Sequence, residues 1–199
     1  NYYTAANTTV TVGTPVTPAA DAAAAVSIAV GAAAQGSVQF DLSLDSASEI
    51  SVAALNLALD ADKAASVSVS DVNSAFDVTQ STYESGKLIV YFGTTGSVNF
   101  SCTEKTKLAT VTVTLAEGAT GSVTATISGA KVSNTDKQAD ADITTASAAA
   151  RILTYDVNND GVIDLRDIAV AQRYYQAKTG DENWDDALSS DVNGDGVVD

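Results

Sequence analysis

Apolar and polar residues alternate with a period of two through most of the first 130 residues, and this pattern restricts the chain to short strands. Val38, Phe40, Leu42 and Leu44, for example, alternate with polar residues. Such alternation puts the apolar side chains on one face of a pleated strand. Glycines mark turns between the segments, and nothing between them has the length and caps of a crossover helix. We therefore expect an all-β sandwich and not an α/β fold.

The same pattern predicts about nine short strands. Residues 88–92 are apolar throughout, which is typical of a sheet covered on both faces. We expect residues 1–9 to form an irregular lead-in, residues 19–25 a loop and residues 146–150 a linker. The predicted strands include residues 10–12, 26–30, 38–44, 52–59, 67–69, 88–92, 108–115 and 123–127.

Missing residue types exclude several classes of site. The chain has no His and one Cys, Cys102. A Ser-His-Asp triad, a His-ligated zinc site and an intrachain disulfide are therefore excluded. We expect Cys102 to be a small buried apolar residue. No apolar run reaches the roughly 18 residues of a membrane span. The sequence begins at Asn1 without Met or a signal peptide, so we expect a mature or excised piece of an exported protein.

The net charge of −15 divides the chain in two. Residues 151–199 contain 11 acidic and 4 basic residues, which puts −7 on about a quarter of the chain. We expect two domains, residues 1–150 and residues 151–199. Their acidity disfavours binding to nucleic acid and to anionic membranes, and it suits a hard cation with oxygen ligands.

The acidic segment contains the template of an EF-hand-like calcium loop. Gly161 at position six allows a sharp turn, and apolar Ile163 at position eight is expected to pack the loop on the core. Calcium takes about six to eight oxygen ligands, and alternating side chains of a tightening loop converge on it. We expect Asp164 to act through a water and Asp167 to chelate with both oxygens. The predicted ligands are Asp156, Asn158, Asp160, the carbonyl of Val162, Asp164 and Asp167.

A second copy of the loop starts 35 residues after the first, which makes an internal repeat. The printed sequence reaches position nine of this copy, so we expect an incomplete second repeat and a weaker second calcium site. Its predicted ligands are Asp191, Asn193, Asp195, the carbonyl of Val197 and Asp199.

The segment between the loops predicts one helix, over residues 165–178. Its apolar residues have helical spacing, with Ile168 and Tyr175 on one face. Gly180 is expected to end the helix. Trp184 is the single Trp, and we expect it to pack against the helix or the sandwich.

Two stretches in the first domain carry a resemblance to a known module. They are "GSVQFDLSLD" at residues 36–45 and "LATVTV" at residues 108–113. Together with the order of strands, they resemble a cohesin over roughly residues 8–145. The resemblance implies a jelly-roll fold and docking of a dockerin module from another protein.

The second domain resembles a dockerin. Residues 154–199 have the dockerin layout of a calcium loop, one helix, a linker and a second calcium loop. The resemblance implies calcium as the cofactor and a cohesin module of another protein as the partner. In that family, positions ten and eleven of the loop and further helix residues contact the cohesin. The matching residues here are Leu165, Arg166, Gln172 and Arg173.

These observations favour a non-catalytic scaffold of the cellulosome type. We expect calcium-dependent assembly of extracellular polysaccharide-degrading enzymes, in a protein that a bacterium secretes or displays on its surface. The alternative is a carbohydrate-binding sandwich carried on a dockerin, with Tyr83 and Phe76 in expected loops. A glycosidase needs paired carboxylates, but Asp60 and Asp62 are expected to form a solvated turn. A further hypothesis is that the sandwich packs on its own dockerin through residues 151–155.

Overall fold

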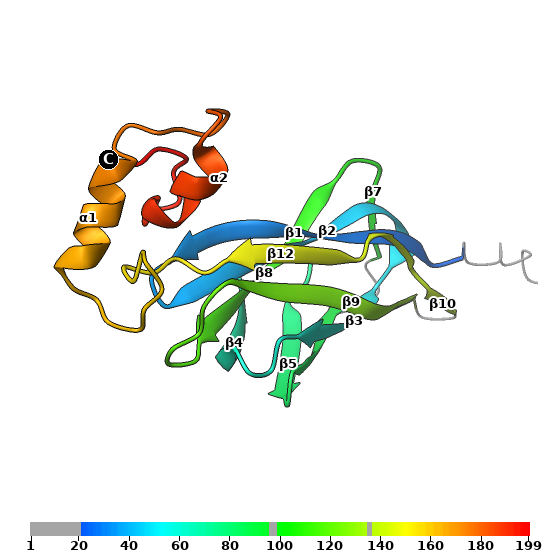
Figure 1. Cartoon of the computed structure of the whole chain (residues 1–199). Coiled ribbons are helices and arrows are strands. Elements are labelled where there is room, and N and C mark those ends of the chain that lie inside the picture. The colour runs from blue at the N-terminus through cyan, green and yellow to red at the C-terminus, as the bar shows by residue number, and fades with distance from the viewer. Residues whose placement is uncertain (1–20, 96–98, 135–136) are drawn as a thin grey trace, which may run out of the picture.

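The structure is a computed structural model that describes residues 21–95, 99–134 and 137–199. It consists of a β-sandwich and a small helical module beyond one end of the sandwich (Figure 1). The strands are β1 (Ala23–Ala34), β2 (Ser37–Ile50), β3 (Val52–Leu59), β4 (Ala64–Ser70), β5 (Val78–Glu84), β6 (Lys87–Gly93), β7 (Phe100–Cys102), β8 (Thr106–Leu115), β9 (Ser122–Ser133), β10 (Gln138–Asp140), β11 (Asp142–Thr145) and β12 (Ser147–Arg151).

The strands form two sheets of six. The first sheet has the order β11-β1-β2-β8-β4, and β7 pairs with β2. The second has the order β10-β9-β3-β6-β5, and β12 pairs with β9. Among the described strands the pairing is antiparallel, except that β1 and β11 run parallel. The predicted all-β sandwich is therefore confirmed.

The core of the sandwich follows the alternation in the sequence. In β2, Val38, Phe40, Leu42 and Leu44 are each 0% exposed. Full burial of such a side chain stabilises the fold by roughly 1.5–3 kcal/mol. Cys102 of β7 is half-buried and packs against this core.

Strand β6 differs from the prediction of a sheet covered on both faces. Leu88, Val90 and Phe92 are buried, but Ile89 and Tyr91 are 38% and 50% exposed. The second sheet is therefore covered on one face only. The unbroken apolar run reflects an apolar outer face and not burial on both sides.

Two segments that the sequence predicts as loop and linker are strands. Residues 23–25 belong to β1, and residues 147–151 form β12, which pairs with β9. Their Ala and Ser side chains show little apolar contrast, so alternation cannot reveal them. The described residues form twelve strands, whereas about nine are predicted. The predicted lead-in at residues 1–9 and strand at residues 10–12 lie outside the described residues.

A polar network ties three strands of the first sheet together. Asp45 of β2 accepts hydrogen bonds from the hydroxyls of Ser27 in β1, at 2.7 Å, and of Thr144 in β11. The ammonium of Lys105 lies 3.5 Å from the same carboxylate. Burial raises the pKa of Asp45, but these hydrogen bonds and the positive charge outweigh it and hold the pKa below the usual 3.8.

The predicted helix ends early. It stops at Arg173, before the predicted end at residue 178 and before Gly180, because the chain turns to pair with the second loop. Gln176 adopts a positive φ of 69°, and Lys178 forms an antiparallel β-bridge with Val197. The helical elements are α1 (Leu165–Arg173), α2 (Trp184–Ala187) and the 3-10 turn η1 (Leu188–Ser190).

The helical module has a small core of its own. Ala177, Ala187 and Val198 are buried, and Tyr174 and Trp184 pack against them. Trp184 therefore packs on this cluster beside the second loop rather than on the sandwich. No helix in the described part of the chain combines the length and the apolar character needed to cross a membrane.

The join between β12 and the helical module is short and apolar. The amide of Ile152 donates to the carbonyl of Gly121 at 2.8 Å, which extends the strand by one residue. Ile152 and Leu153 are each 5% exposed. The methyl groups of Leu153 would lie 3.4 Å from a Cβ atom at Gly194, so Leu153 packs directly on the second loop.

Candidate calcium loops and partner surfaces

In the first loop, backbone amides donate hydrogen bonds to the side chains of three predicted ligands. The carboxylate of Asp156 accepts the amides of Asp160 and Gly161 at 3.1 and 2.9 Å. Asn158 Oδ1 accepts the Asp160 amide at 2.8 Å, and Asp160 Oδ1 accepts the Val162 amide at 3.0 Å. Gly161 has a φ of 85°, which favours glycine. The side chains at positions one, three and five thus lie within a single tight turn.

Asp167 closes the loop from the first turn of α1. Its side chain is 3% exposed and accepts the amides of Asp164 at 2.8 Å and Asn158 at 3.1 Å. These two hydrogen bonds hold the pKa of Asp167 below the usual 3.8, so the carboxylate is ionised at neutral pH. Asp164 is the N-cap of α1 and accepts the Arg166 amide, which completes a capping box with Asp167.

The second loop repeats most of the hydrogen bonds of the first, except that the amide at position four, and not that at position five, donates to the carboxylate at position one. The carboxylate of Asp191 accepts the amides of Gly194 and Gly196 at 2.8 and 3.1 Å. Asn193 Oδ1 accepts the Asp195 amide at 3.0 Å. Gly196 at position six has a φ of 89°. The internal repeat therefore extends from spacing in the sequence to backbone geometry.

The donor set of both loops fits calcium. Every predicted ligand is a carboxylate, amide or carbonyl oxygen, which is the chemistry that calcium prefers. Within the described residues no three carboxylates form a compact metal cluster. Without an ion, like-charged carboxylates repel one another, and in this structure the carboxylates of Asp156 and Asp160 accept hydrogen bonds from backbone amides. Asn side chains and backbone carbonyls complete the set of predicted ligands. Val162 and Asp199, predicted ligands at the rims of the loops, are exposed.

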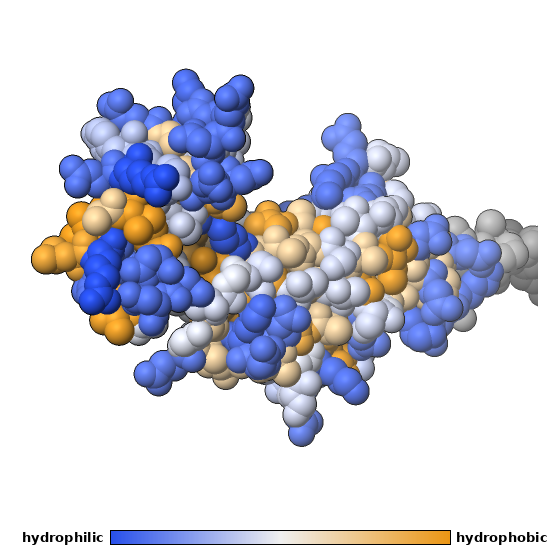
Figure 2. All heavy atoms as spheres, in the orientation of Figure 1, coloured by the Kyte–Doolittle hydropathy of each residue, from blue (hydrophilic) through white to orange (hydrophobic). Residues whose placement is uncertain are grey.

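The apolar side chains around α1 are exposed. Ile163 is 67% exposed, so the prediction that it packs the loop on the core is wrong. Ile168 and Tyr175, predicted to share an apolar helix face, are each 62% exposed. Ile163, Ile168, Leu165 and Tyr155 line an open apolar hollow, and Figure 2 shows apolar atoms gathered over this part of the module. Val157 of the first loop and Val192 of the second also line the hollow, so it lies where α1 meets both loops.

The four predicted partner-binding residues lie on the surface of α1. Leu165 is 79% exposed, and the side chain of Arg166 is 74% exposed. Gln172 and Arg173 are also exposed, and the Arg173 guanidinium lies 5.5 Å from the centre of the Tyr174 ring. Below, the α1 face means Leu165, Arg166, Ile168, Gln172, Arg173 and Tyr175.

The second sheet has an apolar outer face that the sequence analysis missed. Ile89 and Tyr91 stand on it in β6, opposite Asn56 and Ala54 of β3. Val52, also in β3, is 37% exposed. The signal for this face is the apolar run at residues 88–92, which is also typical of burial on both sides. Val52, Ile89 and Tyr91 are called the outer sheet face below.

The remaining candidates of the sequence analysis have structural roles or exposed positions. Asp60 Oδ2 accepts the amide of Thr124 at 2.9 Å, and Asp62 is exposed. This agrees with a turn and not with a catalytic pair. Phe76 is 4% exposed in the core, so its assignment to an exposed loop is wrong. Tyr83 lies half-buried in β5 and not in a loop.

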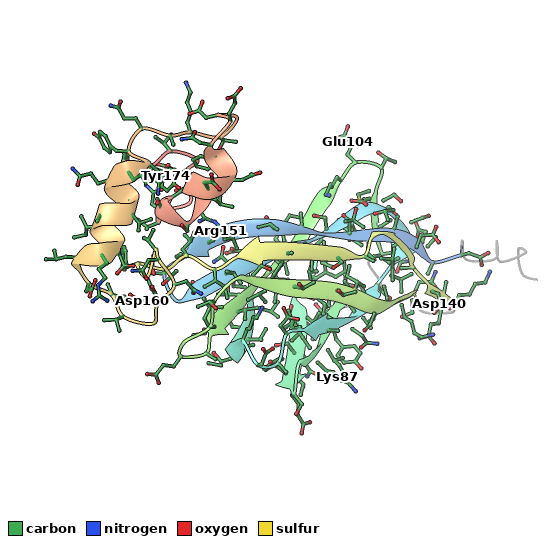
Figure 3. The ribbon with its side chains drawn as sticks, viewed as in Figure 1. Lys87, Glu104, Asp140, Arg151, Asp160 and Tyr174 are labelled. Carbon is green, nitrogen blue, oxygen red and sulfur yellow. The ribbon has the colours of Figure 1, made fainter. Side chains whose placement is uncertain are left out.

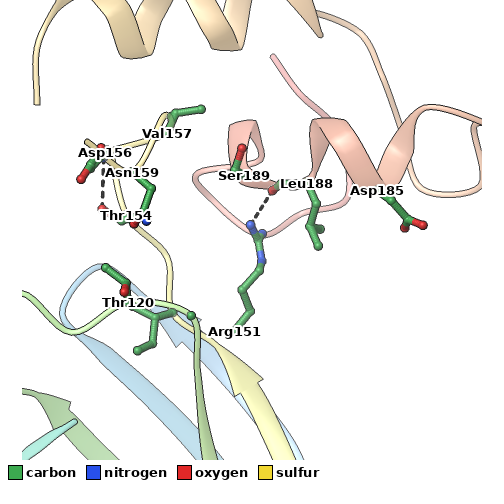
Figure 4. Close-up of a pocket in the computed structure, with 11 residues that line it drawn as sticks. Thr120, Arg151, Thr154, Asp156, Val157, Asn159, Asp185, Leu188 and Ser189 are labelled. Carbon is green, nitrogen blue, oxygen red and sulfur yellow. Dashed lines mark hydrogen bonds between the residues drawn. The ribbon is translucent and has the colours of Figure 1, made fainter. Parts of the chain in front are cut away.

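The second loop sits on the end of the sandwich. Arg151, the last residue of β12, donates to the carbonyl of Leu188 at 2.6 Å and to the carbonyl of Asp191 at 2.8 Å. The same guanidinium lies 3.3 Å from Asp191 Oδ2. It points from the sandwich into the helical module (Figures 3 and 4). Gln35 adds a hydrogen bond to the carbonyl of Val192 at 3.2 Å.

Comparison with known proteins identifies both parts. Residues 154–199 match the model of the dockerin type I domain. The structure is similar to a cohesin module from a family 33 glycoside hydrolase of Clostridium perfringens, with 16% identity, a TM-score of 0.53, and coverage of 65% of this chain and 96% of that one. It is also similar to the sixth cohesin of scaffoldin B from Acetivibrio cellulolyticus, with 20% identity, a TM-score of 0.50, and coverage of 67% and 99%. None of the curated proteins matches the chain.

The two parts of the chain thus resemble two different known modules. Its sandwich has the cohesin-like fold, and residues 154–199 match the type I dockerin domain. Both resemblances drawn from the sequence are confirmed. The comparisons identify no catalytic domain.

Proposed function

We propose that the protein is a non-catalytic, calcium-dependent assembly module that organises extracellular polysaccharide-degrading enzymes of a bacterium. Cohesin and dockerin modules imply assembly of proteins, with the dockerin binding a cohesin of another protein and the sandwich receiving a dockerin. We place the boundary between the two modules close to the predicted one, between Arg151, which ends β12, and residue 154, where the dockerin match begins. One observation carries the proposal: in both loops of the segment that matches the type I dockerin domain, the amide at position six donates to the carboxylate at position one.

The α1 face supports binding of a protein partner by the dockerin. Contiguous exposed apolar surface marks interaction sites on soluble proteins, and Leu165, Ile168 and Tyr175 supply it. Arg and aromatic residues are enriched in the centres of protein interfaces. Arg166 and Arg173 flank the apolar residues and carry two of the four positive charges of residues 151–199. These two charges would select a partner surface with carboxylates or carbonyls.

The outer sheet face supports a second binding site, on the sandwich. Among the aromatic side chains that the structure describes in the sandwich, Tyr91 is the only exposed one. A sugar-binding platform needs several exposed rings, whereas a protein partner can cover one ring with its aliphatic neighbours Val52 and Ile89. This distribution favours docking of a dockerin over the carbohydrate-binding alternative.

Calorimetry against a panel of purified type I cohesin modules tests the proposal. We expect at least micromolar binding to one cohesin in calcium and none in EGTA. Leu165→Ala combined with Arg166→Ala should weaken that binding at least tenfold. Lys131→Ala is the matched control, because Lys131 is an exposed cation that pairs with Asp140 on the sandwich. Binding that persists in EGTA, or no binding across the panel in calcium, would contradict the proposal.

A further inference from the structure

The carboxylate at position one of the second loop already contacts a cation, which the sandwich supplies. Asp191 is 3% exposed, and its Oδ2 lies 3.3 Å from the guanidinium of Arg151. The amides of Gly194 and Gly196 donate to the same carboxylate. The Asp191 carboxylate therefore accepts hydrogen bonds from its own loop and contacts Arg151 of the sandwich. By its position in the template, it is also a predicted calcium ligand.

We propose that Arg151 couples the two modules antagonistically: its contact with Asp191 holds the dockerin on the sandwich and weakens calcium binding by the second loop. The inference rests on the calcium loops of the proposed function. It does not depend on the binding of a partner cohesin.

Electrostatics give this coupling its sign. In the ion-free loop, the guanidinium of Arg151 partly neutralises the buried carboxylate of Asp191, which stabilises that state. With calcium in the loop, the same guanidinium faces a divalent cation across a shared carboxylate, and like charges repel. Both effects favour the ion-free, docked state. The Arg151 side chain is 30% exposed, so solvent screens the effect to about a tenfold change in affinity.

The first loop is an internal comparison. Its position-one residue, Asp156, accepts amides from Asp160 and Gly161. The nearby cation is Arg166, which lies 3.4 Å from Asp160 and is 74% exposed. Because Arg166 and Asp160 both belong to the helical module, their contact does not depend on the position of the sandwich. Coupling to the sandwich is thus a property of the second loop.

Thermodynamic reciprocity extends the inference to docking. If Arg151 weakens calcium binding by a given factor, calcium must weaken the docking by the same factor. The hydrogen bonds to the carbonyls of Leu188 and Asp191 and the bond from Gln35 to Val192 do not use a ligand carboxylate. Calcium therefore loosens the docked arrangement without abolishing it.

Calcium titration of the whole chain by NMR tests the affinity, with the amide signals of Gly161 and Gly196 reporting the two loops separately. Arg151→Gln removes the charge and should tighten the second loop about tenfold. Arg151→Lys keeps the charge but loses the planar fork, so the second loop should stay near the wild-type affinity. Lys131→Gln is the matched control, because Lys131 is an exposed cation of the sandwich that pairs with Asp140, and it should leave the second loop unchanged.

Cross-linking tests the docking. Thr120 and Ser189 are exposed and line a groove between the two modules (Figure 4). In a Cys102→Ser background, Thr120→Cys and Ser189→Cys should react with a short bis-maleimide about tenfold more slowly in calcium than in EGTA. Adding Arg151→Gln should remove most of that difference. Unchanged second-loop affinity in Arg151→Gln, or a cross-linking rate insensitive to calcium, would overturn the coupling alone. Loss of every calcium-dependent signal would overturn the calcium loops as well.

Discussion

Gly161 gives a clean test of the first calcium loop, because the loop uses its backbone and not a side chain. Its φ is 85°, and a Cβ atom at this position would meet nothing within 4 Å. Gly161→Ala therefore introduces no clash and isolates the conformational cost of the left-handed backbone. For an L-residue that cost is roughly 1–2 kcal/mol.

The cost should appear as weaker calcium binding. Closing such a loop is coupled to binding its ion, and 1.4 kcal/mol corresponds to a factor of ten. We therefore expect the Kd of the first loop to rise about 5- to 30-fold in Gly161→Ala. Gly161→Asn should lose much less, because Asn tolerates the left-handed region. Asn159, in the same loop, already adopts a φ of 56°.

The assay is a calcium titration in which the amide signals of the two loops are followed separately. The second loop is an internal reference, since neither variant changes it. Equal losses in the Ala and Asn variants would refute the conformational origin of the effect. Unchanged affinity in the Ala variant would show that the ion-bound loop does not use this backbone conformation.

Three further predictions concern the sandwich. Gly86→Ala should lower the free energy of unfolding in urea by about 1–3 kcal/mol more than Gly36→Ala does. The two residues have similar φ, but a Cβ at Gly86 would lie 2.7 Å from the carbonyl oxygen of Leu59. Equal losses of stability would contradict this close approach. Asp45→Asn should destabilise the sandwich at pH 7, because the lowered pKa means that folding favours the ionised carboxylate. That difference should disappear as the pH falls below 3.8 and through the folded pKa, and unfolding curves that differ equally at pH 7 and below the folded pKa would argue against it. Tyr91→Ala should weaken dockerin binding by the sandwich about tenfold at unchanged stability, and calorimetry that finds no change would remove the outer sheet face from the proposal.

The strands of the sandwich differ in how far the sequence predicts them. In β2 the large apolar residues Val38, Phe40, Leu42 and Leu44 are buried and alternate with polar residues, so local alternation is sufficient. In β12 the residues are Ser, Ala and Arg, and pairing with β9 defines the strand. That pairing is non-local and leaves no pattern within the segment. For β6, alternation is hidden because Ile89 and Tyr91 make the exposed positions apolar as well.

The two candidate calcium loops, unlike β12, are predictable because the residues that define them are close together in the sequence. Their ligands, turn and cap lie within twelve consecutive positions, so spacing alone carries the geometry. The early end of α1 depends on the bridge between Lys178 and Val197, which belongs to the other repeat. The contact between Arg151 and Asp191 joins residues 40 positions apart in different modules and matches no motif. Contacts of this kind can be read only from the folded chain.

The pairing of β12 with β9 also decides how the protein carries load. A force applied to the helical module reaches the sandwich at Arg151, where β12 ends. The connecting residues Ile152 and Leu153 are buried, so the connection is short and packed. The ladder runs antiparallel over five consecutive pairs, from Ser147 opposite Thr126 to Arg151 opposite Ser122. Tension along β12 therefore shears the whole ladder at once and does not open its bonds one after another. A strand of small side chains is therefore the hydrogen-bonded anchor through which the helical module joins the sandwich.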